Sequence, residues 1–202
     1  LRRTVIRDSE GALHSIANNL RAAGFPDWQS CPLEMELRVS PEDEAAAGQL
    51  LGSRAPTRVG LHAGYGPPSG KKNQGQRLRG WGADNFAELG RLLVERGARL
   101  VLTGSPQDRP EAEAIAARLP AGTFLQLAGR TTVRQLAALI RRLQLYISVD
   151  SGPAHMAAAV GTPLVVIWGP GILEQTRPLS PTTPIQMVRH QVFCAPCYGT
   201  PM

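Results

Sequence analysis

Apolar and polar positions alternate along this chain in blocks that predict strands followed by helices. From Arg58 onward, each short apolar run is followed by a polar loop and then by a segment with helical spacing. The predicted strands cover residues 59–63, 99–103, 124–127, 145–149, 164–168 and 185–188, and the predicted helices cover 84–96, 110–119, 132–142 and a short segment after residue 151. This alternation, in units of about 20 to 30 residues, is typical of an α/β fold with a Rossmann-like, doubly wound parallel sheet.

The chain before Arg58 follows a less regular pattern. Residues 10–23 have helical spacing, with apolar residues on one face. Residues 33–39 alternate in a way that predicts an edge strand. Ser40 and Pro41, followed by three acidic residues, predict the start of another helix. We expect this part to be a connector region.

Polar and glycine residues of the repeating part gather in the four loops that follow predicted strands. Because the carboxyl ends of parallel strands meet at one edge of a sheet, these loops are expected to share a single rim, where ligands bind. In chain order the loops carry His62, Gly64, Gly66, Ser69, Lys71, Lys72, Arg77 and Arg79, then Thr103, Gly104, Ser105 and Asp108, then Gly129, Arg130, Thr131 and Thr132, and finally Asp150, Ser151, Gly152 and His155.

The last of these loops has the features of an anion site. Ser151 is placed to cap a helix, and Pro153 suits its first turn. The free N–H groups and the positive end of the helix dipole would then face the rim and suit a phosphate. His155 lies within one turn of that end. Two plainer interpretations remain open, in which Asp150 only closes the turn and His155 is a packed core residue.

Charge and composition exclude only some classes of function. The net charge is +6, and Lys71 and Lys72 are the only lysines. Arginine suits bidentate pairing with phosphate or carboxylate groups. Because the positive charge is spread along the chain, nucleic acid is not expected as a partner. The apolar fraction of 43% supports a sizeable core, and no apolar run approaches the roughly 20 residues of a membrane span.

The two ends of the sequence and its three cysteines indicate a cellular compartment. The charged start shows no signal peptide, and three cysteines do not make a secreted disulfide framework, so a cytoplasmic protein is expected. The chain lacks an initiator methionine and stops just after a cysteine pair, so we expect a piece of a longer protein.

A G-x-G-x-x-G fingerprint is absent after every predicted strand, which argues against an NAD-dependent enzyme.

A set of motifs in this chain resembles the C-terminal half of the family 9 glycosyltransferases, which include the ADP-heptose:lipopolysaccharide heptosyltransferases. The strongest is VDSGPAHMAAAVGTPLVVIWGP at residues 149–170, and its supporting motifs are HAG at 62–64, WGADNF at 81–86, LTGSPQD at 102–108, LAGRTT at 127–132 and CAPC at 194–197. Their order and spacing match the family as well. The resemblance covers roughly residues 59–197.

The resemblance implies one half of a GT-B glycosyltransferase, in which two Rossmann-like domains face each other across a cleft. Residues 1–55 would be the end of the N-terminal acceptor domain and a connector, and residues 56–202 the domain that binds the nucleotide-sugar donor. The family's catalytic base lies near the start of the N-terminal domain. No catalytic residue is therefore expected in this chain, which alone should not turn over.

The resemblance also implies roles for individual residues. The donor's diphosphate and sugar would contact Gly64, Arg79, Asp150, Ser151, Gly152 and His155. The nucleoside would contact Gly104, Asp108, Arg130 and Thr131, with Asp108 accepting hydrogen bonds from the ribose. Sugar transfer with inversion would need no metal and no cofactor. The implied partners are an ADP-sugar donor and a glycolipid or glycan acceptor bound through the other domain, with peripheral association at the inner membrane as an option.

Some positions depart from the family pattern or leave alternatives. Arg79 stands where the family usually has lysine, and residues 171–173 replace small or polar residues, which weakens any inference about heptose itself. Cys194 and Cys197 are expected to be a structural pair or half of an incomplete metal site. Trp81 and Phe86 are expected to pack rather than to stack on a base. The competing functions are a nucleotide-sugar epimerase of two-Rossmann type and a non-catalytic nucleotide-binding module.

Overall fold

The described part of the chain forms a single parallel sheet. The computed structural model describes residues 13–27, 29–52, 57–64 and 79–191. In these ranges six strands pair in the order β3-β2-β1-β4-β5-β6, every neighbouring pair being parallel. The strands are β1 (Arg58–His62), β2 (Arg99–Leu102), β3 (Phe124–Gln126), β4 (Leu145–Val149), β5 (Leu164–Ile167) and β6 (Ile185–Val188). The predicted doubly wound fold is confirmed, and its chain order reverses between β1 and β4, which is where ligands bind in such sheets.

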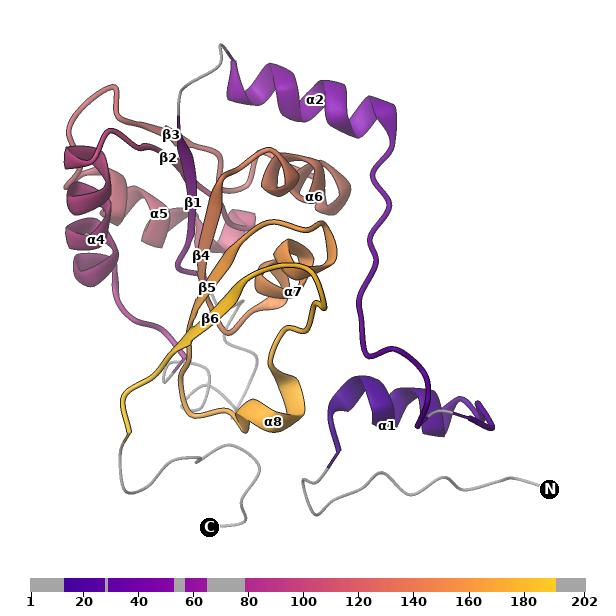
Figure 1. Cartoon of the computed structure of the whole chain (residues 1–202). Coiled ribbons are helices and arrows are strands. Elements are labelled where there is room, and N and C mark those ends of the chain that lie inside the picture. Colours follow the sequence, from indigo (N-terminus) through magenta and orange to yellow (C-terminus); the bar gives the residue numbers. More distant parts are fainter. Residues whose placement is uncertain (1–12, 28, 53–56, 65–78, 192–202) are drawn as a thin grey trace.

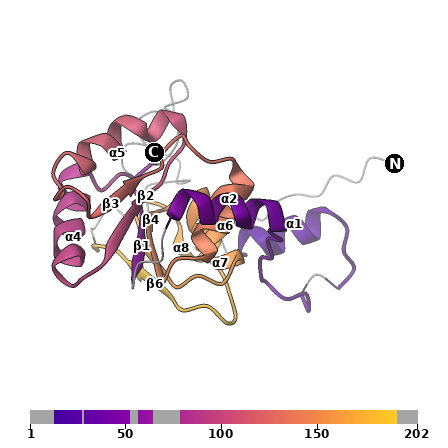
Figure 2. The same ribbon diagram turned by 90° about the horizontal axis from the view of Figure 1, so that it is seen from above.

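Helices cover both faces of the sheet (Figures 1 and 2). On one face α4 (Ala83–Glu95) and α5 (Arg109–Ala116) bury Phe86 and Ile115 against the odd-numbered side chains of β1. On the other, α6 (Val133–Arg141) and α7 (Gly152–Ala159) pack against Tyr146 and the even-numbered side chains of β5. Two apolar clusters separated by the sheet thus form the core.

Several helices begin where the sequence predicts. Thr132 caps α6 by accepting a hydrogen bond from the Gln135 N–H at 3.2 Å, and the Gln135 side-chain oxygen accepts one from the Thr132 N–H at 3.0 Å. Ser40 caps α2 (Pro41–Leu51) in the same manner, accepting from the Asp43 N–H at 3.2 Å. Such caps satisfy backbone donors that have no partner inside the helix.

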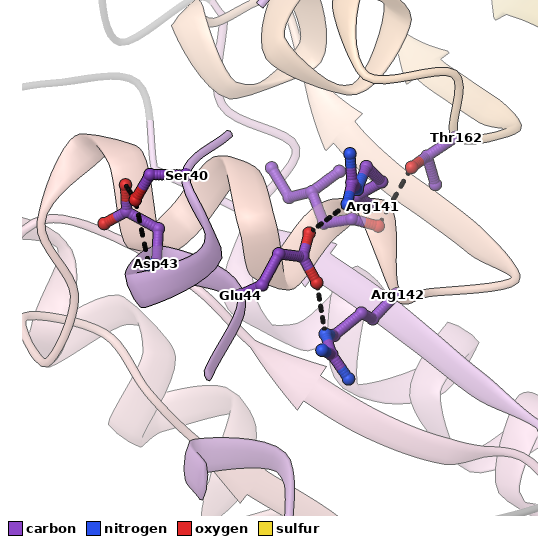
Figure 3. A network of polar contacts seen from close by, with 7 residues as sticks. Ser40, Asp43, Glu44, Arg141, Arg142 and Thr162 are labelled. Atoms are coloured by element: carbon purple, nitrogen blue, oxygen red, sulfur yellow. Dashed lines mark hydrogen bonds and ion pairs between the residues drawn. The ribbon is translucent and has the colours of Figure 1, made fainter. Parts of the chain in front are cut away.

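A three-residue ion cluster joins α2 to α6 (Figure 3). One carboxylate oxygen of Glu44 lies 2.7 Å from Arg141 Nη2, and the other lies 2.8 Å from Arg142 Nε. Ala47 and Leu51 of α2 are buried in the same apolar cluster as α6. Charge and apolar packing therefore hold the connector helix on the sheet. The expected domain boundary near residue 55 stays a prediction.

The edge strand predicted for residues 33–39 is wrong. The segment is extended but is not a strand, and among the described residues the sheet ends at β3 and β6. Its alternation has another cause, since residues 35, 37 and 39 are half-buried while residues 34, 36 and 38 are exposed. Met35 and Val39 pack against the buried cluster that includes Ala47 of α2 and Leu139 of α6. Burial of alternate residues without strand pairing thus gives the same two-residue period as a strand would.

Shorter elements complete the described chain. Of the helix predicted for residues 10–23, α1 (Ser15–Ala22) is seen, and His14 Nδ1 accepts the Ile16 N–H at its start. A short helical turn, η2 (Pro106–Asp108), precedes α5, and α8 (Leu173–Thr176) follows β5. Across the described ranges, none of the helices has the length and apolar character to cross a membrane.

Candidate functional site

A cavity of about 730 Å³ opens at the carboxyl ends of the neighbouring strands β1 and β4, with His62 and Asp150 in its lining. All four loops predicted to share this rim contribute to it. Its lining consists of His62, Gly64, Arg79, Gly104, Ser105, Pro106, Gln107, Asp108, Thr131, Thr132, Val133, Leu136, Asp150, Ser151, Gly152, Pro153 and Met156. Polar groups of the loops face apolar side chains from α6 and α7 across this space.

A smaller cavity of about 330 Å³ lies beside the first and shares a wall with it. Arg79, Asp150, Ser151 and Gly152 line both. Beyond that wall, the smaller cavity is bounded by His155, Gly171, Ile172, Gln175 and Thr176. The arrangement suits an elongated ligand with two different ends and a middle group held at the shared wall.

The shared wall pairs a cation with a buried acid. Arg79 Nε lies 3.7 Å from Asp150 Oδ2, and Asp150 is 7% exposed. Burial raises the pKa of the Asp150 carboxyl, while Arg79 and then His155 oppose that rise. The wall therefore combines a guanidinium with a carboxylate whose charge is costly to bury.

The start of α7 also faces both cavities. Ser151 occupies the capping position, but its side chain does not cap the helix, so that prediction is wrong. Its Oγ instead pairs with Ser148 Oγ at 2.9 Å. A Cβ at Gly152 would meet open space, so the Gly152 N–H at the start of α7 lies beside the wall without side-chain cover. This donor and the helix dipole suit an anion.

His155 follows one turn into α7 and is half-buried. Burial lowers the pKa of its imidazole, Asp150 opposes that effect, and His14 adds to it. At neutral pH the ring is then neutral and carries one N–H, which is a hydrogen-bond donor for a ligand in the smaller cavity.

Asp108 lines the larger cavity, and its side chain lies in a narrow space beside Gly64 and Gly104. Its Oδ2 accepts hydrogen bonds from the Ser105 N–H at 2.8 Å and from the Ser105 hydroxyl at 2.6 Å. A Cβ on either Gly64 or Gly104 would overlap the Asp108 side chain. Two glycines from different loops thus make room for this carboxylate and fix it at the rim.

Comparison with known protein families shows which family matches the region of the two cavities. The model of glycosyltransferase family 9 (heptosyltransferase) matches residues 72–201. The chain belongs to glycosyltransferase family 9. The match includes Arg79 and the last three of the four loops at the rim, which carry Asp108, Thr131 and Asp150.

Curated relatives match about half of this family 9 chain. Lipooligosaccharide heptosyltransferase 2 of Haemophilus influenzae is 35% identical over 103 residues, which are 50% of this chain and 30% of that protein. Lipopolysaccharide heptosyltransferase 3 of Escherichia coli is 40% identical over 96 residues, or 46% of this chain and 28% of that protein. The matched segments therefore span less than a third of these relatives.

Solved structures are similar over nearly the whole chain. The structure of E. coli ADP-heptose lipopolysaccharide heptosyltransferase II is 25% identical, with a TM-score of 0.74, and the match covers 95% of this chain and 61% of that one. A family 9 structure from Veillonella parvula has a TM-score of 0.76 at 19% identity, covering 93% of this chain and 52% of that one. The latter supports the fold alone.

Most residues predicted for the family 9 site come together, but one does not. Arg130 is exposed and does not line either cavity, whereas Thr131 beside it does. Trp81 packs edge-on against the buried Phe86, with ring centroids 5.2 Å apart, which confirms the predicted packing role. Several other candidates lie outside the described residues: Gly66, Ser69, Lys71, Lys72, Arg77, Cys194 and Cys197.

The structure adds lining residues that the sequence did not single out. Val133 and Leu136 come from the first turns of α6, and Gln175 and Thr176 come from α8. The capping Thr132 signals that the next residues start a helix at the rim, so Val133 could have been found. Nothing in the local pattern indicates that the four-residue α8 bounds the smaller cavity.

Proposed function

We propose that this chain binds the nucleotide-sugar donor of a heptosyltransferase that acts on lipopolysaccharide core or a related glycan. The observation that carries the proposal is the pair of cavities with a shared wall of Arg79, Asp150 and the start of α7. Membership of family 9 and the names of the similar proteins support heptose as the sugar and ADP as the carrier. Family membership also disfavours the epimerase alternative.

In this proposal, the two ends of the donor occupy different cavities. The nucleoside enters the larger one, where Asp108 and the apolar side chains of α6 lie. The sugar enters the smaller one, beside His155 and Gln175. The diphosphate lies between them at the wall, within reach of Arg79 and the N–H groups at the start of α7.

The chemistry proposed is transfer with inversion. The acceptor hydroxyl attacks the anomeric carbon while the bond from that carbon to the diphosphate oxygen breaks. The hydroxyl proton passes to a base outside these 202 residues, in keeping with the expectation that the base belongs to the acceptor domain. Arg79, the α7 N–H groups and the His155 N–H stabilise the negative charge that develops on the leaving diphosphate. Peripheral association with a membrane would bring the lipid acceptor to the site.

Calorimetric titration tests the donor site directly. The chain is titrated with ADP, with an ADP-sugar and with UDP in the presence of EDTA. We expect ADP and the ADP-sugar to bind without added metal. Arg79→Ala should weaken ADP binding about tenfold, because it removes a charged hydrogen-bond donor from the diphosphate.

Arg96→Ala provides a matched control, because Arg96 is exposed at the end of α4 and lines neither cavity. Its ADP affinity should equal that of the unchanged chain. Equal losses in both variants, or no binding of any nucleotide, would refute the proposed donor site. Preference for UDP would overturn ADP as the carrier.

A further inference from the structure

The short helix α8 forms one side of the smaller cavity and is anchored at three points. Leu173, its first residue, packs against one of the two buried apolar clusters. Just before the helix, the Trp168 Nε1–H donates to the Gly171 carbonyl at 2.9 Å. Just after it, His14 Nε2 lies 3.0 Å from the Arg177 carbonyl. Because His14 Nδ1 accepts the N–H at the start of α1, Nε2 carries the proton and is the donor in this contact.

The anchored helix brings two polar side chains to the smaller cavity. Gln175 and Thr176 belong to its lining, whereas their neighbour Glu174 is exposed and does not. The Thr176 hydroxyl donates to the Ile172 carbonyl at 3.4 Å. The Gln175 side chain is half-buried and makes no hydrogen bond within the described part of the chain. Its carboxamide is therefore available to a ligand in the cavity.

The charges of the smaller cavity lie on the wall that it shares with the larger one. Arg79 and Asp150 face each other there at 3.7 Å. The described residues on the other sides are His155, Gly171, Ile172, Gln175 and Thr176. Burial lowers the pKa of His155, so its ring is uncharged at neutral pH. This end of the cavity thus offers hydrogen bonds but no formal charge, and a charged group of a ligand would lose water there without gaining an opposite charge.

A carboxamide at this place is complementary to neighbouring hydroxyl groups. Each sugar hydroxyl both donates and accepts hydrogen bonds, and the carboxamide has an oxygen that accepts and an NH₂ group that donates. Two hydroxyl groups on adjacent carbons can therefore bind the Gln175 side chain at the same time. Because α8 is anchored on both sides, little conformational freedom of the backbone is lost when they do.

We infer that Gln175 is a specificity-determining residue for the donor, and that it selects an uncharged sugar by pairing its carboxamide with two neighbouring hydroxyl groups. The inference rests on the proposed function, because it places the sugar of the donor in the smaller cavity.

Calorimetric titration with ADP and with ADP-heptose measures the contribution of the sugar. The ratio of the two dissociation constants, ADP over ADP-heptose, isolates the sugar end of the ligand. Gln175→Leu, which keeps a side chain of similar size, should lower this ratio at least about fivefold and leave ADP affinity unchanged, because each lost hydrogen bond costs about a factor of five. Gln49→Leu is the matched control, since Gln49 is exposed on α2 and lines neither the larger nor the smaller cavity. Its ratio should equal that of the unchanged chain.

A second comparison tests the class of sugar. ADP-glucuronate differs from ADP-glucose by a carboxylate in place of the hydroxymethyl group. We expect the unchanged chain to bind ADP-glucuronate at least about tenfold more weakly, because the carboxylate would be desolvated at the uncharged end of the cavity. Gln175→Lys should narrow this difference by placing an ammonium group there. Equal affinities in the unchanged chain, or the same difference in Gln175→Lys, would overturn the selection of an uncharged sugar by this residue.

The outcomes separate the inference from the proposed function. If ADP binds but the ratio in Gln175→Leu is unchanged, the role of Gln175 is wrong and the donor site still stands. If the unchanged chain binds neither ADP nor ADP-heptose, the proposed function fails and the inference fails with it. If Gln175→Leu does not fold, Gln175→Met, which is apolar and unbranched like glutamine, is measured against the same criteria. Failure of both variants to fold would show that the side chain is structural and would overturn the inference.

Discussion

The two carboxylates at the rim are held in different ways. Asp108 receives two hydrogen bonds from Ser105, whereas Asp150 is almost fully buried with Arg79 as its cation at 3.7 Å. A buried charge at that distance is only partly compensated. In the proposed donor site, the charge of Asp150 would thus be kept at the expense of the fold, a common conflict at functional sites.

Asp150→Asn is expected to stabilise the free chain at neutral pH. The folded pKa of Asp150 is raised by burial, so the protonated carboxyl folds better than the charged one. That stability is present below the ordinary aspartate pKa and is lost as pH rises through the raised one. The variant should match the unchanged chain near pH 4 and exceed its Tm by up to about 3 °C at pH 7. Thermal unfolding from pH 4 to 8 measures the difference.

Glu113→Gln is the control, since Glu113 is exposed on α5. It should show no such trend. A lower Tm for Asp150→Asn at pH 7 would mean that the ion pair with Arg79 outweighs the cost of burial.

Local sequence was a good guide to residues that lie next to each other in the chain. Asp150, Gly152 and His155 were predicted together because one strand end and one helix start hold them. The capping role predicted for Ser151 is wrong, because its hydroxyl pairs with that of Ser148 on the strand instead. The slot of Asp108 depends on Gly64 and Gly104, which only the folded sheet brings together.

At the scale of elements, α6 links the connector helix to the cavity. Its first turn supplies Val133 and Leu136 to the rim, and Arg141 near its end binds Glu44 of α2. Glu44 also binds Arg142, so one carboxylate holds two cations (Figure 3). A shift of α2 along the sheet would break both contacts.

Glu44→Gln should loosen α2 without changing the fold. Both arginines are about half exposed, so we expect a loss of only about 0.5–1 kcal/mol in the free energy of unfolding. The loss should shrink at high salt, which screens exposed pairs. Urea unfolding at low and high salt measures it, with Glu88→Gln on the exposed side of α4 as control. A loss that does not depend on salt would show that packing rather than charge holds the helix.

The order of strands and helices was predictable from the sequence, whereas the conformation of residues 33–39 was not. From residue 58 onward, each apolar run has strand length and is followed by a helical pattern, which leaves few alternatives. Residues 33–39 show the limit of that reasoning. Residues 35, 37 and 39 are half-buried although they pair with none of the described strands, and a two-residue period does not say which part of the protein buries them.

At the scale of the whole molecule, the larger cavity joins loops from four strands. One of its apolar walls contains Val133, which is 72% exposed. An exposed apolar side chain at the mouth of a ligand cavity adds nothing to the core. It is available to pack against the base of a nucleotide.

Val133→Ser is therefore expected to weaken ADP binding without lowering stability. Losing this contact should cost about 1 kcal/mol, or roughly fivefold in affinity. Val188→Ser, in which the changed residue is 49% exposed on β6 and lines neither cavity, should bind ADP normally. Calorimetry and thermal unfolding of both variants give the comparison, and equal ADP affinities would exclude Val133 from the base contact.

The wall common to both cavities has a consequence for inhibitor design. Ligand fragments in the larger and the smaller cavity would sit on opposite sides of Arg79 and Gly152, close enough for one short linker to join them. Joining two weak binders converts the second association into an intramolecular one, with an effective concentration in the millimolar range for a short flexible linker. Compounds that replace the diphosphate by an uncharged bridge could then gain affinity from geometry alone.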